Sequence, residues 1–253
     1  MIELYLADCL RRMSRIDDNS IDLTVTSPPY DNLRTYNGNN AQWGEHVWKA
    51  VIKDLFRVTK QGGVVVWVVN DKVKKGSETL TSFHQALFFK ECGFNVHDTM
   101  IWHKPNAMPN IDKSRYCQSF EYMFVLSKGK PKTTNLIEIP TKNGGEVKKR
   151  NTLQTQNINK KNRCDKTKMT RIGFNVYVLM VGGKKEAEHP AIFPEQLANY
   201  HIVSWSNKGD TILDPFMGSG TTGKIAKQLN RNFIGIELDP DYYEIAKERI
   251  NNS

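Results

Sequence analysis

The chain has 253 residues, of which 39% are hydrophobic, and its formal net charge is +9. This length can bury one sizeable core together with a smaller appended lobe. The longest apolar run, residues 64–69, is too short to cross a bilayer, and the N-terminus lacks the basic and apolar pattern of a signal peptide. We therefore expect a cytoplasmic protein without a membrane partner, whose positive charge favours a polyanion.

The four cysteines show no metal-binding or catalytic spacing. Cys9, Cys92, Cys117 and Cys164 form no CxxC pair and have no nearby histidine pattern of a zinc site. None of them follows a proline in an active-site-like turn, so covalent attack on a pyrimidine ring carbon is not supported. We expect reduced thiols and no metal.

Hydrophobic periodicity predicts alternating strands and helices in the first half of the chain. The expected strands are residues 3–7, 21–26, 64–69, 95–102 and 122–127, and the expected helices are 10–16, 43–58 and 81–92. Residues 64–69 form a continuous run rich in valine, which is typical of a parallel strand buried on both faces. Gly62 and Gly63 are expected to end the helix before this strand.

The periodicity is lost after Ser127 and returns near residue 194. The segment 129–188 is rich in Lys, Asn, Thr and Gly, apart from an apolar stretch at 174–181. From 141 to 171 it carries ten basic residues and two acidic ones, a local charge of +8. Lys148, Lys149 and Arg150 are its candidates for phosphate contacts. A partly disordered surface loop is the alternative interpretation.

The order that follows again alternates helices and strands. The pattern predicts helices at 194–205, 221–229 and 241–250, and strands at 211–213 and 232–237. The whole chain is therefore expected to be an α/β protein that is interrupted by a basic insert.

A glycine turn joins the strand 211–213 to the next helix. Residues 218–223 match GxGxxG, and Glu237 ends the following strand 19 positions after Gly218. In this context the pattern predicts a nucleoside cofactor, with the acidic residue on a ribose hydroxyl. Gly220 is expected to leave room for the nucleoside.

The residues before the glycines indicate which kind of cofactor binds. Asp214 places a carboxylate at the end of the strand, and Phe216 can lie against an aliphatic or sulfonium group. A pyrophosphate prefers backbone N–H groups without a carboxylate nearby, whereas S-adenosylmethionine carries an ammonium and a sulfonium. The sequence therefore favours S-adenosylmethionine over a dinucleotide.

A second turn, Ser27-Pro28-Pro29-Tyr30, follows the strand 21–26. The prolines lack N–H donors, which leaves the carbonyls around them free to accept hydrogen bonds. An exocyclic amine can donate to the Ser27 hydroxyl and the Pro28 carbonyl, while its base stacks on Tyr30. Ligand sites of open α/β sheets lie beyond the carboxyl ends of the strands, which favours this interpretation over a plain connecting turn.

These two turns and four further segments resemble the DNA amino-methyltransferases, the N4-cytosine and N6-adenine family, in the β-class motif order. The matching segments are 6–10, 26–36, 101–115, 188–197, 214–222 and 233–237. The resemblance implies a doubly wound, mostly parallel seven-stranded sheet with one reversed strand, of the S-adenosylmethionine-dependent methyltransferase type. Residues 1–128 would be the catalytic half, 129–188 a basic target-recognition insert, and 189–253 the cofactor-binding half.

The resemblance also implies a set of site residues. Ser27, Pro28, Pro29 and Tyr30 would be catalytic. Cofactor contacts would come from Asp8, Phe193, Asp214, Pro215, Phe216, Gly218, Ser219, Gly220, Thr221, Thr222 and Glu237. DNA contacts would come from Arg34, Lys104, Arg115, Lys148, Lys149 and Arg150. Helix capping is the alternative role for Asp8 and Asp214, and strand termination is the alternative for Lys104.

The expected reaction is methyl transfer from S-adenosylmethionine to the N4 of a cytosine flipped out of double-stranded DNA, by direct in-line displacement. Adenine N6 is the alternative target. An RNA amino-methyltransferase, a dinucleotide-dependent oxidoreductase and a non-catalytic DNA-binding module are the other hypotheses. A homodimer, and a cognate restriction endonuclease acting separately, are compatible with the family.

Overall fold

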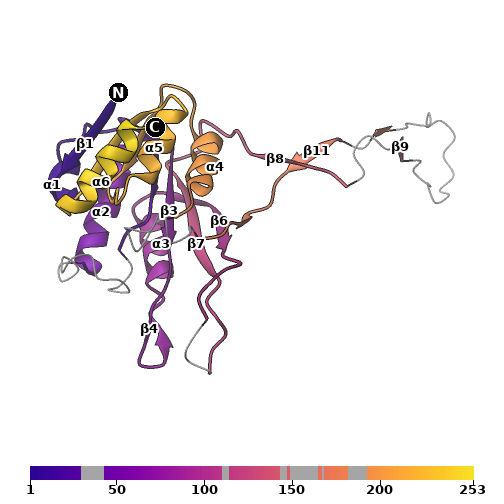
Figure 1. The fold of residues 1–253 in the computed structure, drawn as a ribbon, viewed down its shortest axis with the longest axis horizontal. Helices are drawn as coiled ribbons and strands as arrows, with labels where there is room; N and C mark the ends of the chain where they lie inside the picture. The colour runs from indigo at the N-terminus through magenta and orange to yellow at the C-terminus, as the bar shows by residue number, and fades with distance from the viewer. Residues whose placement is uncertain (30–42, 110–113, 143–146, 149–164, 167, 182–192) are drawn as a thin grey trace. The chain divides into compact units, whose positions relative to one another are not determined.

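The computed structural model describes residues 1–29, 43–109, 114–142, 147–148, 165–166, 168–181 and 193–253 (Figure 1). It divides into two compact units. The larger unit comprises Met1–Asn135 and Asn175–Ser253, and the smaller unit is Leu136–Phe174.

An eight-stranded sheet forms the centre of the larger unit. Its strands lie in the order β1 (Ile2–Leu6), β14 (Asn232–Glu237), β13 (Thr211–Asp214), β2 (Ile21–Thr26), β3 (Thr59–Val69), β7 (Phe120–Ser127), β6 (Asn95–His103) and β12 (Val176–Val178). Only β7 is reversed, since it pairs antiparallel with both β3 and β6. The mostly parallel sheet with one reversed strand is confirmed, but its predicted strand number is too low by one. The additional strand, β12, comes from the apolar stretch that we assigned to the insert.

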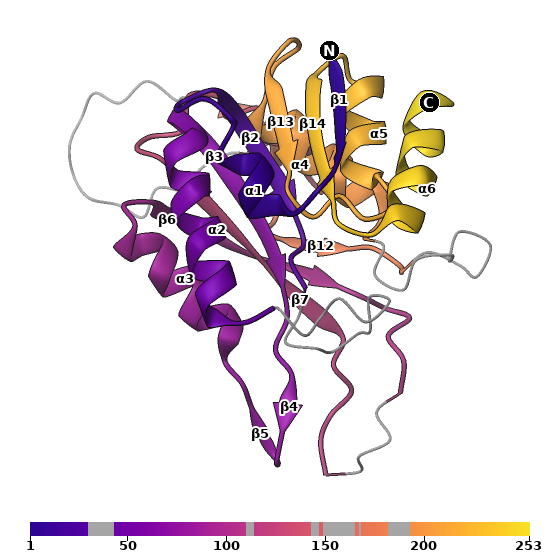
Figure 2. The same ribbon diagram turned by 90° about the vertical axis from the view of Figure 1, so that its left-hand side faces the viewer.

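Six helices cover the two faces of this sheet (Figure 2). They are α1 (Cys9–Met13), α2 (Glu45–Val58), α3 (Thr81–Glu91), α4 (Glu195–Trp205), α5 (Thr221–Gln228) and α6 (Pro240–Asn251). Buried side chains of α1, α2 and α3 share one hydrophobic cluster with one face of the sheet. Those of α4, α5 and α6 share a second cluster with the other face. The fold is therefore doubly wound.

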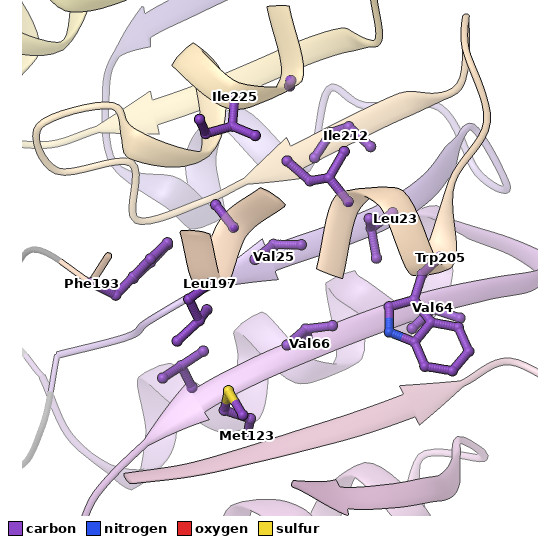
Figure 3. Close-up of a cluster of buried hydrophobic side chains, with 14 of the residues drawn as sticks. Leu23, Val25, Val64, Val66, Met123, Phe193, Leu197, Trp205, Ile212 and Ile225 are labelled. Atoms are coloured by element: carbon purple, nitrogen blue, oxygen red, sulfur yellow. The ribbon is translucent and has the colours of Figure 1, made fainter. Parts of the chain in front are cut away.

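Strand β3 shows how the sequence builds these two layers. The even-numbered residues of 64–69 belong to the cluster with α4, α5 and α6, and the odd-numbered ones to the cluster with α1, α2 and α3. All six side chains are at most 2% exposed. Figure 3 shows Val64 and Val66 beside Leu23, Val25 and Ile212 of the neighbouring strands. Burial on both faces explains the continuous apolar run.

Gly62 and Gly63 do not end a helix, so that expectation was wrong. Helix α2 ends at Val58, and both glycines lie inside β3. The register along β2 shifts here, because Ile21 pairs with Thr59 whereas Leu23 pairs with Val64. Gly62 has a φ of +80°, and a Cβ on Gly63 would lie 2.8 Å from the Thr59 Cγ2 atom. The glycines therefore allow an irregular bulge in the strand.

A short hairpin that the sequence analysis did not predict follows β3. It consists of β4 (Val73–Lys74) and β5 (Ser77–Glu78), which pair antiparallel. Lys75 and Gly76 form its turn, with φ angles of 50° and 80°. Positive φ at both central residues is the geometry of a tight two-residue hairpin turn. The only sequence signal for this turn is the single glycine after two lysines. The flanking residues show no apolar alternation that would have indicated strands.

Two small ladders lie in the smaller unit. β8 (Glu138–Pro140) pairs with β11 (Thr170–Ile172), and β9 (Val147–Lys148) pairs with β10 (Asp165–Lys166). All four strands fall within the predicted insert 129–188, which extends beyond this unit at both ends. The division into catalytic half, recognition insert and cofactor-binding half stays a prediction.

Within the described residues, no helix is long and apolar enough to span a membrane. The same part of the chain holds no group of three or more His, Cys, Asp or Glu side chains that could bind a metal ion.

Candidate functional site

The two predicted turns leave the sheet at the carboxyl ends of neighbouring parallel strands. Ser27 follows β2, and Pro215 follows β13, which pairs with β2. From β2 the chain continues through α2 to β3 on one side, and from β13 it continues through α5 to β14 on the other side. The strand order therefore reverses between β2 and β13. Such a topological switch point is where open α/β sheets bind ligands.

Hydrogen bonds join the two strand ends directly. The Thr26 hydroxyl donates to the Asp214 Oδ1 atom over 2.6 Å. The Thr222 hydroxyl donates to the Val25 carbonyl over 3.2 Å. Sequence reasoning placed Thr26 in the matching segment 26–36 but gave it no role. The Thr222 hydroxyl links α5 to β2, and the predicted role of Thr222 at the cofactor stays a prediction. These bonds fix the Ser27 turn relative to the glycine turn.

Asp214 is a buried carboxylate without a cationic partner. Its residue is 2% exposed, and no Lys or Arg of the described chain forms an ion pair with it. Burial raises its pKa to about 6, although hydrogen bonds from Thr26 and the Phe216 N–H oppose this shift. It does not cap α5, whose N-cap is Gly220. The capping alternative is therefore excluded for Asp214.

Glu237 places a second carboxylate at the same edge of the sheet. Its Oε2 atom accepts from the Gly218 N–H over 2.7 Å, and its Oε1 atom accepts from the N–H groups of Leu238 and Asp239 over 2.9 Å each. Burial raises the pKa of Glu237, and its negative charge also raises the pKa of Asp214. Two carboxylates whose charged forms are disfavoured suit a ligand that brings positive charge and disfavour a pyrophosphate. The residues present thus fit S-adenosylmethionine.

The glycines of the turn serve backbone geometry and helix packing. Gly218 and Gly220 have φ angles of 52° and 81°. A Cβ on Gly220 would lie 2.9 Å from the Ala246 Cβ of α6, and a Cβ on Gly223 would lie 2.5 Å from both Phe233 and Ile250. The missing side chain of Gly220 leaves room for α6. The expectation that Gly220 also leaves room for the nucleoside stays a prediction.

Arg249 of α6 forms hydrogen bonds to the glycine turn. The sequence analysis did not identify this residue. Its guanidinium donates to the Ser219 carbonyl over 2.8 Å and to the Ser219 hydroxyl over 2.7 Å. It also lies 3.3 Å from the Glu195 carboxylate of α4, which pairs with Lys224 of α5 at 2.6 Å. Ser219 is 5% exposed. One side chain thereby fixes the central residue of the glycine turn: its Nη1 atom donates to both Ser219 oxygens, while its Nη2 atom faces the Glu195 carboxylate.

We expect Arg249→Ala to weaken S-adenosylmethionine binding about tenfold. Leaving the Ser219 groups without this partner costs about 1–3 kcal/mol, and part of that cost is expected to appear as a less well ordered glycine turn. Isothermal calorimetry measures this, and Lys247→Ala is the matched control, since Lys247 lies on the same helix, where it pairs with Glu244 and lies over the Tyr243 ring. Equal affinity in the two variants would contradict this role of Arg249.

Phe216, the aromatic residue of the turn, packs against two tryptophan rings. The Phe216 ring lies 5.3 Å from the Trp43 ring and 6.3 Å from the Trp67 ring, both edge-on. Phe216 itself is half-buried. Such perpendicular contacts hold the Phe216 ring in place, and its predicted role at the cofactor stays a prediction. Tyr30 and Arg34, which we also assigned to the site, lie outside the described residues.

Two further predicted cofactor residues have structural roles. Asp8 caps α1, since its carboxylate accepts from the Arg11 N–H over 2.9 Å, as the capping alternative states. It still lies at the site edge of the sheet, because the Ala7 N–H donates to the Glu237 carbonyl. Phe193 is 8% exposed and packs in the core beside Leu197 (Figure 3). Its role at the cofactor therefore stays a prediction.

The predicted DNA contacts are placed only in part. Lys104 pairs with the buried Glu121, and its ammonium lies 4.5 Å from the Trp102 ring centroid, so its charge is already engaged inside the protein. Arg115 donates to the Gly76 carbonyl of the hairpin. Lys148 belongs to β9 in the smaller unit, whereas Lys149 and Arg150 lie outside the described residues. The structure therefore does not favour Lys104 as a phosphate contact.

The raised pKa of Asp214 predicts a pH-dependent affinity for a cationic ligand. Below pH 6 its carboxyl is largely neutral, so affinity for S-adenosylmethionine should rise as pH increases from about 5 to 7. The stability of the ligand-free protein should depend on pH in the opposite direction. Because the folded pKa of about 6 exceeds the ordinary 3.8, this group stabilises the fold below pH 3.8 and loses that contribution as pH rises through 6.

Calorimetric titrations across this range test the expectation. Asp214→Asn should bind the cofactor more weakly, with most of the pH dependence removed. Glu237→Gln measures how much the second carboxylate contributes to cofactor affinity and to its pH dependence. An affinity that does not vary with pH in the unaltered protein would contradict the prediction.

A doubly wound sheet whose switch point carries a glycine turn and two carboxylates, neither of which forms an ion pair among the described residues, is typical of an enzyme that binds a cationic nucleoside cofactor. A family model described as DNA methylase matches residues 21–248, which is most of the chain. The chain belongs to this family, and it is an S-adenosylmethionine-dependent DNA methyltransferase of the N4-cytosine or N6-adenine type.

Individual relatives agree with this assignment. The chain is 50% identical over 247 residues to the orphan methyltransferase M.BamHII of Bacillus amyloliquefaciens, covering 94% of this chain and 91% of that protein. It is 29% identical to the type II methyltransferase M.SmaI of Serratia marcescens, covering 98% and 90%.

Solved structures share the fold over nearly the whole chain. The M1.HpyAVI complex with S-adenosylmethionine has a TM-score of 0.64 at 26% identity, covering 98% of this chain and all of that one. The cytosine-N4-specific PvuII DNA methyltransferase has a TM-score of 0.74 at 21% identity, covering 98% and 86%, and at this identity the likeness concerns the fold alone.

Proposed function

We propose that this methyltransferase modifies the exocyclic N4 of a cytosine that is flipped out of double-stranded DNA. The observation that carries the proposal is the Ser27-Pro28-Pro29 turn at the end of β2, which the Thr26–Asp214 hydrogen bond ties to the cofactor side. A flipped base is required because an amino group inside a stacked duplex cannot reach such a turn.

The turn offers acceptors to an amino group. Pro28 is buried, and Ser27 and Pro29 are half-buried directly beyond the strand. In the proposed complex the Ser27 oxygen and the Pro28 carbonyl accept the two N–H groups of the amine, and Tyr30 stacks on the base. Two such hydrogen bonds turn the nitrogen lone pair out of conjugation with the ring and direct it toward the electrophile.

S-adenosylmethionine would supply an electrophilic methyl group: the new N–C bond forms as the S–CH3 bond breaks, S-adenosylhomocysteine leaves, and the surplus proton of the amino nitrogen passes to water. Because that group is already activated, Ser27 need only accept a hydrogen bond and orient the nitrogen. Holding both reactants at the joined strand ends supplies part of the rate, on the order of several kcal/mol. Asp214, Glu237, Phe216 and the glycine turn hold the cofactor in this proposal.

The base is assigned from the side chain at position 27. A short, neutral hydroxyl can accept from the amino group of a pyrimidine without crowding its ring, and the Ser-Pro-Pro-Tyr form resembles that of the cytosine enzymes of the family. Adenine N6 is the second candidate, because Tyr30 can stack on either base. A homodimer, a separate cognate endonuclease and action in the cytoplasm stay predictions.

The test is mass spectrometry of nucleosides from treated DNA. Genomic DNA from a host without methyltransferases is the substrate, because it contains every short recognition sequence. We expect N4-methylcytosine that depends on both enzyme and S-adenosylmethionine. Detection of N6-methyladenine alone would replace the proposed base, and preferential methylation of structured RNA in a competition assay would replace DNA as the substrate.

A further inference from the structure

The β4–β5 hairpin projects from the same edge of the sheet as the site. It follows β3, which is the neighbour of β2 on the side away from β13. From Asn70 to Gly76 an extended chain reaches about 20 Å at about 3.3 Å per residue. Figure 2 shows the hairpin extending beyond the sheet next to the chain that follows β6. The strand that leads into it, β3, lies one strand spacing, about 4.8 Å, from β2, the strand that Ser27 follows.

The base and tip of the hairpin are held by specific hydrogen bonds. The Asp71 carboxylate accepts from the Ser82 N–H over 2.9 Å and also from the Ser82 hydroxyl. The Thr79 N–H donates to the Lys72 carbonyl over 2.8 Å. At the tip, Arg115 donates to the Gly76 carbonyl. A two-stranded ribbon alone is marginal in water, so these anchors make the projection an ordered element.

The charge of the hairpin is positive at its tip. Lys74 and Lys75 are exposed, and neither forms an ion pair or side-chain hydrogen bond within the described part of the chain. The one acidic residue of the hairpin, Glu78, lies 4.0 Å from the Arg115 guanidinium. The bulk of the molecule's excess charge lies in the insert, so these lysines form a separate basic feature.

We propose that the hairpin 72–79 is a second DNA-binding element, whose Lys74 and Lys75 contact phosphates of the duplex that flanks the flipped base. This inference rests on the proposed function, since it needs duplex DNA over the Ser27 turn. A base inserted at the end of β2 leaves its duplex above this edge, and a projection of about 20 Å exceeds the roughly 12 Å width of the major groove. Paired lysines on a rigid ribbon contribute affinity rather than base specificity.

The test compares two charge-matched double variants. In the first, Lys74→Gln with Lys75→Asn removes the tip charge, and asparagine is chosen because it tolerates the positive φ of position 75. In the control, Lys130→Gln with Lys208→Gln removes two exposed charges at the opposite edge, where β7 ends and β13 begins. Both proteins carry the same net charge.

Duplex binding is measured by fluorescence anisotropy with a labelled random-sequence duplex of about three helical turns. Each lost phosphate contact lowers the slope of log affinity against log salt by about 0.9. We expect the tip variant to lose about two units of slope and about 30-fold in affinity near 0.15 M salt, and the control to lose little. Calorimetry should show unchanged S-adenosylmethionine affinity in both.

A third variant gives the opposite sign. Glu78→Gln removes the acidic residue of the hairpin and its ion pair with Arg115, so duplex binding should become several-fold tighter with a steeper salt slope. Equal slopes for the tip variant and the control would overturn the inference while leaving the proposed function intact. If the unaltered protein itself neither binds nor methylates duplex DNA, the proposed function fails and the inference fails with it.

Discussion

Replacing Tyr30 with alanine is expected to lower methyl transfer about a hundredfold or more while leaving S-adenosylmethionine affinity nearly unchanged. Stacking on a base is worth about 1–3 kcal/mol, and each 1.36 kcal/mol is a factor of ten in rate, to which loss of orientation adds. Tyr30 follows Pro29 in the sequence, and Pro29 lies beyond β2, at the edge that also carries Asp214 and the glycine turn. The prediction therefore separates the base side of the site from its cofactor side.

Tyr30→Phe is the matched control, because it keeps the ring and removes only the hydroxyl. Single-turnover methylation of genomic DNA measures the rate, and calorimetry measures cofactor affinity. We expect the phenylalanine variant to keep most of the activity. An alanine variant with full activity, or one that has lost cofactor binding, would show that the side chain does not stack on the target base.

The Gly220→Ala substitution should destabilise the protein by more than the same substitution at Gly209. Both glycines have a positive φ, 81° and 85°, so the backbone strain is matched. The new methyl group on Gly220 would meet the Ala246 backbone of α6 at 3.0 Å, whereas nothing lies within 4 Å of the one on Gly209. Overpacking of this kind costs about 1–3 kcal/mol beyond the shared strain.

Thermal unfolding of both variants measures this difference. At about 2–4 °C per kcal/mol for a chain of this size, Gly220→Ala should melt about 2–12 °C below Gly209→Ala, and cofactor binding should weaken only as a consequence of displaced packing between α5 and α6. If instead Gly220→Ala keeps its melting temperature and loses only cofactor affinity, the methyl group would face the cofactor and the packing role would be wrong.

The strands and helices were largely predictable because each buries a local apolar pattern. Residues 64–69 indicate a strand covered on both faces, and β3 is covered in that way. The predictions of secondary structure fail where the backbone geometry does not follow the local apolar pattern. The glycines at 62–63 sit in a bulge of β3, and β12 is a three-residue edge strand formed by an apolar stretch within a polar segment.

The candidate site shows the same division. The chemistry of its two turns was predictable, since prolines, glycines and strand-end carboxylates act through local backbone geometry. The role of Gly220 was not predictable, because it depends on Ala246, which reaches the turn only when α6 packs on α5. Arg249 had no signal in the sequence for the same reason, being 30 residues from the serine that it holds.

The sequence by itself therefore determined the class of chemistry, methyl transfer from S-adenosylmethionine to DNA. The amine-binding role of the Ser27 turn and the recognition role of the basic insert stay predictions. Only the tertiary structure decided that the two turns are joined, because Thr26 and Asp214 are 188 residues apart and meet only when β2 and β13 pair. It also decided the raised pKa of Asp214, since that shift arises from burial by the surrounding layers rather than from neighbours in the chain.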